Sequence, residues 1–374
     1  MCPAPTMPRM ALPLDVCIRG AGIVGRALAL LLARERLRVG LVESAEPPPS
    51  DVRAFALNAA SRDLLQALRA WPDEVQATPV LRMDIQGDEQ GAVHFDAREQ
   101  GVPALAWIAD AQALQQRLAE AVRYQPLIEP LAAPQEAALT VVCEGRASAS
   151  RAGFGVHFDV THYPQQAIAA RLACEQAHGG VARQWFSDGN ILAFLPTGGP
   201  AGNSVALVWS VRQEHAPGLL SLAPGEFAAR IEAASHGALG KVTLAGERVA
   251  WPLQLAQASR WCGPGWALAG DAAHTLHPLA GQGLNLGLAD ARELAQVMHR
   301  REYWRSVGDE KLLRRYERSR KSQVSAMQWA TDGLQQLFAQ DGEPWAWVRT
   351  WGLRGFDRSG PLKLWVARQA AGRF

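Results

Sequence analysis

The sequence has few cysteines, and their positions exclude two classes of cross-linked fold. The five cysteines among 374 residues are Cys2, Cys17, Cys143, Cys174 and Cys262. No two of them form a C-x-x-C pair, so neither a zinc cage nor a disulfide framework is indicated. We expect a protein of a reducing compartment that holds no metal.

Long hydrophobic runs are also missing. No apolar run reaches the roughly 18 to 20 residues that a membrane-spanning helix needs. The first twelve residues include three prolines and lack the apolar core of a signal peptide. We therefore expect a cytoplasmic protein, and we leave open a peripheral contact with the inner membrane.

The chain carries little net charge. Its 38 basic and 36 acidic residues give a formal net charge of +2, so no global field favours nucleic acid as a partner. Hydrophobic residues make up 48% and charged residues 20%, which is typical of a globular protein. A chain of this length exceeds what one hydrophobic core usually holds, which favours two closely joined domains.

A glycine motif lies near the N-terminus, between an expected strand at residues 14–19 and an expected helix at residues 26–35. Residues 20–25 read G-A-G-I-V-G, the G-x-G-x-x-G of dinucleotide-binding folds. In that motif Gly20 makes the tight turn, Gly22 lets a pyrophosphate approach the backbone, and Gly25 lets helix pack on strand. Glu43 ends the next expected strand, where an acid can bind a ribose hydroxyl. The alternative is a glycine-rich turn without a ligand, and the motif alone does not choose between NAD and FAD.

A second, longer motif selects the cofactor. Residues 270–274 read G-D-A-A-H, and residues 278–285 read P-L-A-G-Q-G-L-N. This pattern resembles the FAD-dependent aromatic hydroxylases, the class typified by para-hydroxybenzoate hydroxylase. The resemblance implies that Asp271 binds ribityl or phosphate-linked hydroxyls of FAD. It also implies that the loop after Pro278 presents backbone N–H groups to the flavin, and that the following helix N-terminus stabilises negative charge on the reduced ring.

The positions expected to serve the cofactor form one set. The expected cofactor-binding residues are Gly20, Gly22, Gly25, Glu43, Arg53, Gln112, Gly270, Asp271, Gly281, Gln282, Gly283, Leu284 and Asn285. The expected catalytic positions are Pro278, Gly281 and Gly283, which position the flavin without any side-chain nucleophile. The alternative for the second motif is a helix N-terminus with incidental glycines. His274 and His277 lack further ligands, so we interpret them as motif positions rather than as a metal site.

Further segments resemble one branch of that class, the hydroxylases of ubiquinone biosynthesis. Residues 51–58 read D-V-R-A-F-A-L-N and match that branch's D-x-R-x-x-A-L segment. The implied role of Arg53 is a charge-assisted contact with the FAD pyrophosphate or the flavin edge. Its alternative is a surface arginine capped by Asp51. Gln112 lies at an expected helix start where the branch has another FAD contact.

The order of expected elements predicts the fold class. We expect an α/β (α+β) protein, with a Rossmann-like FAD-binding domain, an inserted and mostly antiparallel β-sheet substrate domain, and a C-terminal helical region. The FAD-binding domain is expected to be discontinuous, at residues 12–78, 104–153 and 254–330. The substrate domain is expected at residues 79–103 and 154–253, and the helical region at residues 331–374.

The resemblance implies an FAD-dependent monooxygenase that hydroxylates an electron-rich aromatic ring, here a polyprenylphenol of ubiquinone biosynthesis. NADH or NADPH would reduce the flavin, and O2 would then form a flavin C4a-hydroperoxide that the ring attacks. We expect pocket walls at Phe194, Leu195 and Pro196, with plain core as the alternative. The basic and tryptophan-containing stretch after residue 300 allows contact with a membrane or a biosynthetic complex, and homo-oligomerisation is open. The alternative for that stretch is helical core with solvated charge.

One segment departs from the family pattern. The family has an A-D-G segment that contacts FAD and NAD(P)H, and here Cys143, Glu144 and Gly145 take its place. Glutamate keeps the charge but is one methylene longer. This departure supports one alternative function, a catalytically impaired flavin-binding scaffold of a biosynthetic complex. A hydroxylase of another aromatic compound is the second alternative.

Overall fold

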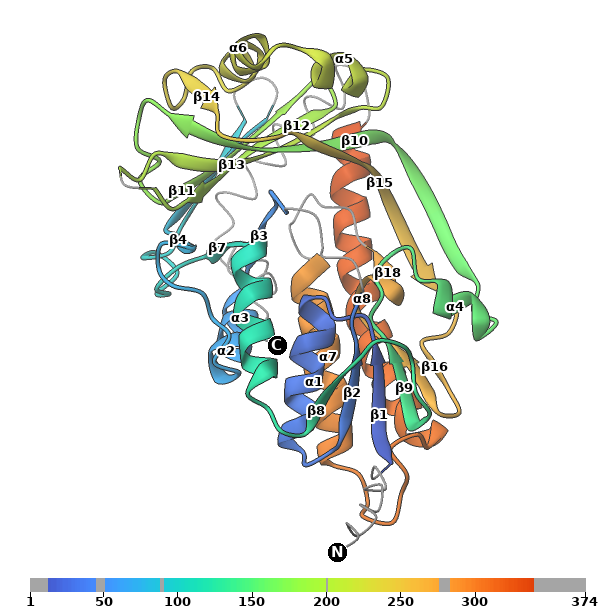
Figure 1. Ribbon diagram of the computed structural model, residues 1–374. Helices are drawn as coiled ribbons and strands as arrows, with labels where there is room; N and C mark the ends of the chain where they lie inside the picture. Colours follow the sequence, from blue (N-terminus) through green and yellow to red (C-terminus); the bar gives the residue numbers. More distant parts are fainter. Residues whose placement is uncertain (1–12, 45–50, 88–90, 200, 276–282, 340–374) are drawn as a thin grey trace, which may run out of the picture.

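The structure is a computed structural model that describes residues 13–44, 51–87, 91–199, 201–275 and 283–339. Figure 1 shows two layered regions, one above the other. The lower region holds a parallel sheet with long helices, and the upper region is a large twisted sheet covered on its outer face by α5 (Ala216–Ser221) and α6 (Pro224–Ala234).

The lower sheet has six strands and begins from the first strand of the chain. Its order is β16 (Cys262–Gly263), β17 (Trp266–Leu268), β9 (Ala137–Val142), β1 (Leu14–Arg19), β2 (Val39–Val42) and β8 (Ile128–Leu131). All neighbours pair in parallel except β16 with β17. Parallel strands are buried on both faces, which explains the nearly continuous apolar run of β1.

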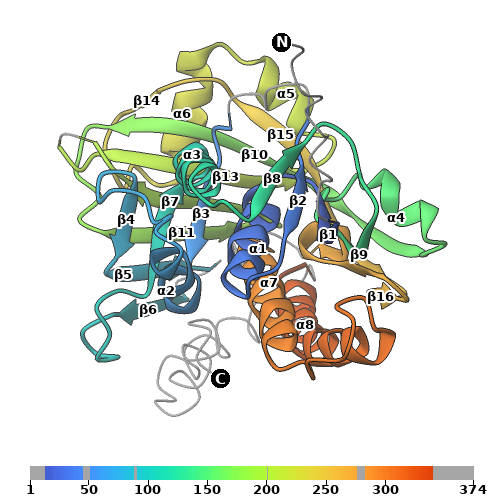
Figure 2. The same ribbon diagram turned by 60° about the horizontal axis from the view of Figure 1, so that its bottom comes forward.

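Long helices pack beside this sheet. They are α1 (Ile23–Arg34), α3 (Ala111–Arg123), α7 (Gly283–His299) and α8 (Glu310–Ala339). Figure 2 shows α1, α7 and α8 as one cluster beside the strands. Their apolar faces form the main core together with β1, β2, β9 and β17. Within the described ranges, no helix combines the length and hydropathy needed to cross a bilayer.

A small sheet joins the two regions. It has the order β3 (Ala54–Leu57), β7 (Ala106–Asp110) and β4 (Ala77–Val80), all antiparallel. The short helix α2 (Ala59–Ala67) follows β3, and its N-cap Asn58 accepts a hydrogen bond from the Ser61 N–H through Oδ1 at 2.9 Å. This connection holds the segment after residue 51 between the large sheet and α7.

The upper sheet has nine strands. Its order is β18 (His274–Thr275), β15 (Val249–Ala258), β10 (Phe158–Cys174), β13 (Ser204–Arg212), β12 (Asn190–Thr197), β11 (Val181–Ser187), β5 (Arg82–Gln86) and β6 (Ala92–Asp96), with β14 (Val242–Leu244) beside β10. Every pair is antiparallel except β11 with β5. A second core lies between this sheet and α6.

The predicted fold class is confirmed, with a mostly antiparallel sheet inserted into a Rossmann-like domain. Part of the predicted C-terminal helical region is α8, which continues to residue 339, while residues 340–374 lie outside the described part. The predicted domain boundaries remain a prediction. Strand β15 runs from residue 249 to 258 within the large sheet, across the boundary that we placed after residue 253.

Candidate functional site

Four parallel strands of the lower sheet end in one row. In the register Arg19 lies opposite Val42 on one side and Val142 on the other, and Val142 lies opposite Leu268. Ligands of open α/β sheets bind beyond the carboxyl ends of the strands. The row therefore brings together segments that are far apart in the sequence: the glycine turn after β1, the acid after β2, and the turns after β9 and β17.

The glycine turn after β1 has the geometry that a phosphate-binding turn needs. Gly20 has φ +105°, and a Cβ at this position would lie 2.6 Å from the Cys143 carbonyl oxygen. A Cβ on Gly25 would lie 1.9 Å from the Gly20 oxygen, so α1 can approach β1 only with glycine there. A Cβ on Gly22 would meet nothing within 4 Å, which leaves space for a ligand. Helix α1 begins without a side-chain cap, so its first N–H groups can bind an anion.

Glu43 follows β2 directly and lies at the same edge. Its N–H donates to the Leu131 carbonyl, and its Oε1 lies 3.4 Å from Nη2 of Arg26 on α1. The side chain is 44% exposed, so the carboxylate can accept a further hydrogen bond from a ribose. The ribose contact remains a prediction.

The turn after β17 places a carboxylate beside this row. Gly270 has φ +62°, a conformation that favours glycine, and it begins the short helix η1 (Gly270–Ala272). Among the described residues, the Asp271 carboxylate has no hydrogen-bond partner in the structure. Asp271 is open to solvent on one side, and enclosure by the surrounding chain raises its pKa, an effect that His274 and Arg146 partly oppose.

Arg53 makes a two-pronged ion pair with Asp51. The Nε–Oδ1 and Nη2–Oδ2 distances are both 2.7 Å, and the guanidinium lies 5.5 Å from the centre of the Phe55 ring. The hydrogen bond to Asp51 raises the pKa of Arg53, with a smaller contribution from the charge of Asp271. The ion pair with Asp51 agrees with the alternative that Arg53 is a surface arginine capped by Asp51. The charge of Asp271 also acts on Arg53, which is consistent with a position near the proposed cofactor edge. Its contact with FAD remains a prediction.

Asn285 is buried in the first turn of α7, and its side chain forms hydrogen bonds with backbone groups of the β3–α2 junction. Its Oδ1 accepts from the Asn58 N–H at 3.0 Å, and its Nδ2 donates to the Ala56 carbonyl at 2.8 Å. These two hydrogen bonds join α7 to the β3–α2 junction, and they were not predicted from the sequence. Gln112 is exposed at the second residue of α3, whose N-cap is Asp110.

The remaining predicted positions of the second motif are only partly described. Pro278, Gly281 and Gln282 lie outside the described residues. Gly283 is the first residue of α7, and a Cβ there would meet nothing within 4 Å. Leu284 is half-buried and packs against the main core. The roles proposed for these residues at the flavin therefore remain predictions.

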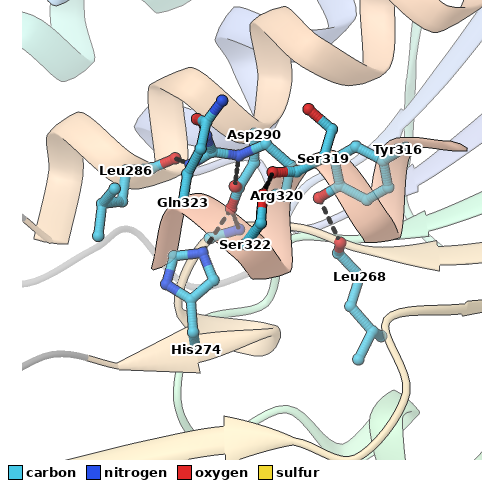
Figure 3. Close-up of polar contacts among 10 residues, drawn as sticks. Leu268, His274, Leu286, Asp290, Tyr316, Ser319, Arg320, Ser322 and Gln323 are labelled. Carbon is cyan, nitrogen blue, oxygen red and sulfur yellow. Dashed lines mark hydrogen bonds and ion pairs between the residues drawn. The ribbon is translucent and has the colours of Figure 1, made fainter. Parts of the chain in front are cut away.

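A buried charged cluster that was not predicted from the sequence lies around Asp290, His274 and Arg320 (Figure 3). Asp290 on α7 is fully buried, and it contacts Gly270, His274 and Arg320. Burial alone would raise the pKa of Asp290, but its interactions with His274 and Arg320 lower it overall. Residues 290 and 320 are 30 positions apart, and no pattern in the sequence indicates that their side chains meet.

The segment that departs from the family pattern is also held by hydrogen bonds. Ser148 Oγ donates to Glu144 Oε2 at 2.8 Å, and Ser150 Oγ donates to Oε1 at 2.6 Å. Burial alone would raise the pKa of Glu144, but the hydrogen bonds from Ser150 and Ser148 lower it overall. Arg151 continues this turn and donates to the Ala272 carbonyl at 3.1 Å. The segment therefore braces the turn that carries Asp271.

The three predicted pocket residues do not share one face of the large sheet. Phe194 is 1% exposed and packs in the core under α6, which agrees with the plain-core alternative, and its place in a pocket wall remains a prediction. Pro196 shares that face, because alternate residues of a strand point the same way. Leu195 lies on the opposite face, where it packs toward β3, β4 and β7. The alternation of side chains along a strand does not reveal which face of the sheet meets the cofactor site.

Comparison with known proteins identifies the family. A family model described as an FAD binding domain matches residues 132–330, more than half of the chain. The 3-demethoxyubiquinol 3-hydroxylase of Escherichia coli K12 is 34% identical over 396 residues, covering 96% of this chain and 99% of that protein. The chain belongs to the family of FAD-dependent aromatic hydroxylases.

Two further comparisons extend the same result to the whole fold. The ubiquinone hydroxylase UbiL of Rhodospirillum rubrum is 31% identical to this hydroxylase, covering 96% of this chain and 89% of that protein. Among solved structures, the p-nitrophenol 4-monooxygenase PnpA of Pseudomonas putida has a TM-score of 0.72 at 18% identity, covering 96% of both chains. PqsL of Pseudomonas aeruginosa has a TM-score of 0.70 at 20% identity, covering 97% of this chain and 100% of that one. At these identities the two structures show the fold alone.

The residues at the strand edge fit the cofactor of the family. The space over Gly22 and the uncapped start of α1 suit a pyrophosphate, and the Asp271 carboxylate suits a hydroxyl donor. This FAD-dependent hydroxylase is therefore a monooxygenase with O2 as co-substrate.

Proposed function

We propose that this monooxygenase hydroxylates the ring of a polyprenylated phenol in ubiquinone biosynthesis. The observation that carries the proposal is the 34% identity to a 3-demethoxyubiquinol 3-hydroxylase over almost the full length of both chains. NADH or NADPH supplies the electrons, and bound FAD supplies the chemistry that activates O2. No side-chain nucleophile is required for this reaction.

Each group at the strand edge has a role in holding FAD under this proposal. The backbone over Gly22 and the N–H groups of α1 bind the pyrophosphate, and Glu43 accepts a hydrogen bond from the adenosine ribose. Asp271 accepts from a ribityl hydroxyl. Arg53 is held by Asp51 and brings positive charge to the same edge, which favours the phosphates.

We propose that the large sheet offers one face to the substrate. The contacts of Arg171 on β10 support the choice of face, because its guanidinium donates to the Val52 and Arg53 carbonyls of the proposed cofactor region. The register puts Arg171, Ala206 and Leu195 in one row of that face, with Ala169, Val208 and Ala193 in the next. We propose that the aromatic ring binds between the row of Ala169, Val208 and Ala193 and the flavin, where an apolar wall keeps water from the reaction.

The test is product analysis with isotopically labelled oxygen. The purified protein, reconstituted with FAD, is given NADH or NADPH, a short-chain prenylphenol and 18O2. The proposal predicts a product that contains one labelled oxygen on the ring. Rapid nucleotide oxidation that releases peroxide without a ring product, across a panel of prenylphenols, would contradict the substrate assignment and favour another aromatic compound.

We also propose a peripheral contact with the inner membrane, where a polyprenylated substrate resides. Tyr303 is 96% exposed and Trp304 is 66% exposed, and the Arg305 guanidinium lies 4.7 Å from the centre of the Trp304 ring. Arg305 pairs with Glu302 and Asp309, so the proposal rests on the two exposed aromatic rings, which suit the headgroup region of a bilayer. Sedimentation with anionic vesicles should fall when Trp304→Ser is introduced, and equal sedimentation of both proteins would contradict this contact.

A further inference from the structure

We propose that Arg320 on α8 and Asp290 on α7 are positioning residues for FAD, and that α8 is thereby coupled to cofactor binding. Neither residue was predicted from the sequence to bind the cofactor. Their side chains meet directly, as Figure 3 shows, and Asp290 also accepts a hydrogen bond from the N–H of Gly270, the residue before Asp271. The inference rests on the proposed role of that turn in binding FAD.

The contacts of Asp290 define its position completely. Its Oδ2 accepts a hydrogen bond from the Gly270 N–H at 2.9 Å and lies 2.7 Å from Nε2 of His274. Its Oδ1 accepts from Nε of Arg320 at 2.7 Å. Asp290 is 0% exposed, His274 is 1% exposed and Arg320 is 2% exposed. A buried carboxylate with this many donors is fixed in orientation, and removing one charged partner leaves the other charge uncompensated.

The link to the cofactor runs through the Gly270 N–H. Gly270 has φ +62°, so the chain turns sharply here, and the next residue is Asp271. The hydrogen bond from Gly270 to Asp290 fixes the start of this turn and hence the direction of the Asp271 carboxylate. Ligand groups bind tightly when their own partners hold them in place before binding.

Helix α8 holds the same segment at three other points. Tyr316 Oη donates to the Leu268 carbonyl at 2.8 Å, two residues before Gly270. Glu317 Oε1 accepts from the Trp261 N–H at 2.9 Å, and Lys321 Nζ donates to the Ser259 carbonyl at 2.8 Å. Because coupling free energies are reciprocal, a helix that stabilises bound FAD must itself be stabilised when FAD binds.

The experiment compares three variants of the full chain, each prepared without FAD. Arg320→Met removes the buried charge at similar length, and Arg320→Lys keeps a charge. Arg314→Met is the matched control, because Arg314 lies on the same helix, is 54% exposed and, among the described residues, pairs only with Glu310 on the surface. For each protein the measured quantities are the dissociation constant for FAD, from flavin fluorescence, and the melting temperature without FAD.

We expect Arg320→Met to weaken FAD binding by about 10- to 100-fold, by analogy with the loss of side chains that orient metal ligands. Arg320→Lys should recover part of the affinity, and Arg314→Met should stay within about twofold of the parent. A lowered melting temperature of Arg320→Met with an FAD affinity within about twofold of the parent would overturn the proposal, because the pair would then serve stability alone.

Hydrogen exchange on the unmodified protein tests the same coupling if Arg320→Met does not fold. We expect FAD to slow amide exchange in residues 312–322 of α8 as well as around residues 268–275. Protection confined to residues 268–275 and the glycine turn would overturn the coupling. A separate variant, Asp271→Asn, distinguishes a failure of the proposed function from a failure of this inference. An unchanged FAD affinity of Asp271→Asn would contradict the proposed role of the Asp271 carboxylate. The Arg320 variants would still decide whether Arg320 and Asp290 position the turn.

Discussion

Arg171 of the large sheet and Asp110 at the N-terminus of α3 form an ion pair, with 2.6 Å between Nη2 and Oδ2. The other oxygen of Asp110 caps α3 by accepting from the Ala113 N–H at 3.0 Å. The same guanidinium donates to the Val52 and Arg53 carbonyls at 2.8 and 2.9 Å. One arginine therefore joins the substrate-side sheet to the segment that carries Arg53 and to the start of α3.

Replacing this arginine should loosen the joint. Arg171→Met leaves Asp110 without its charged partner and frees two carbonyls, so we expect the free energy of unfolding to fall by about 1–3 kcal/mol. Chemical denaturation measures this change. Arg212→Met, at an exposed position of the same sheet, is the control and should stay within about 0.5 kcal/mol of the parent. Equal losses for both variants would contradict a specific role for Arg171.

The Asp271 carboxylate should favour FAD binding but lower the stability of the FAD-free protein. Enclosure raises the pKa of its carboxyl, so the charged form is disfavoured in the fold. This penalty exists above the folded pKa and vanishes below the unfolded value of about 4. Asp271→Asn should therefore raise the melting temperature of the FAD-free protein at neutral pH, but not at pH below about 4, and should weaken FAD binding. A lower melting temperature at neutral pH would contradict this account.

Glu144 should act as a brace rather than as a ligand of the nucleotide. Its carboxylate already accepts hydrogen bonds from Ser148 and Ser150, and Arg151 of the same turn donates a hydrogen bond to the Ala272 carbonyl. Glu144→Ala should slow flavin reduction by NADH or NADPH and lower the free energy of unfolding by about 1–2 kcal/mol, because it leaves donors unpaired. Ser150→Ala should have a smaller effect of the same kind.

The shorter acid tests the alternative for this position. The family has aspartate where this chain has Glu144, and an aspartate carboxylate reaches less far toward the two serines. If Glu144→Asp speeds flavin reduction, the acid contacts the nucleotide and the brace is incorrect. If neither NADH nor NADPH reduces the flavin of the parent or of any variant at residue 144, the flavin-binding scaffold becomes the better description.

Acid should release the buried charges of the cofactor edge. The folded pKa values of Asp290, Glu144 and Asp51 are all lowered by their partners despite burial. A lowered folded pKa contributes stability above the unfolded value of about 4, and this stability is lost as the pH falls through the folded values. The melting temperature should therefore be steady from pH 7 to 5 and fall steeply below pH 4. Asp290→Asn should flatten that fall, and a steep fall of unchanged size in the variant would contradict the assignment.

Local patterns in the sequence predicted the parts of the site that local geometry dictates. The turn at Gly20, Gly22 and Gly25 is such a case: Gly20 and Gly25 are required by close contacts of the backbone, and Gly22 leaves space for a ligand. The fold class followed from the order of strands and helices for a similar reason.

The parts that sequence reasoning missed depend on contacts between distant residues. Asp290 and Arg320 are 30 positions apart, and Arg171 and Asp110 are 61 apart, so neither pair forms a pattern in the sequence. Phe194 and Leu195 were both expected in the pocket wall, but neighbours along a strand point to opposite faces, and alternation does not fix which face meets the cofactor. Asn285 has a polar side chain in a cofactor motif, and only the fold shows that it holds the backbone of Ala56 and Asn58.

The most direct test of the central claim is anaerobic reduction of the FAD-loaded protein by NADH and by NADPH, followed by flavin absorbance with and without a short-chain prenylphenol. A hydroxylase that binds the phenol against the flavin should be reduced by at least one nucleotide, and faster when the phenol is present. A flavin that neither nucleotide reduces, with or without the phenol, would contradict the claim that this chain is a nicotinamide-driven hydroxylase of prenylated phenols.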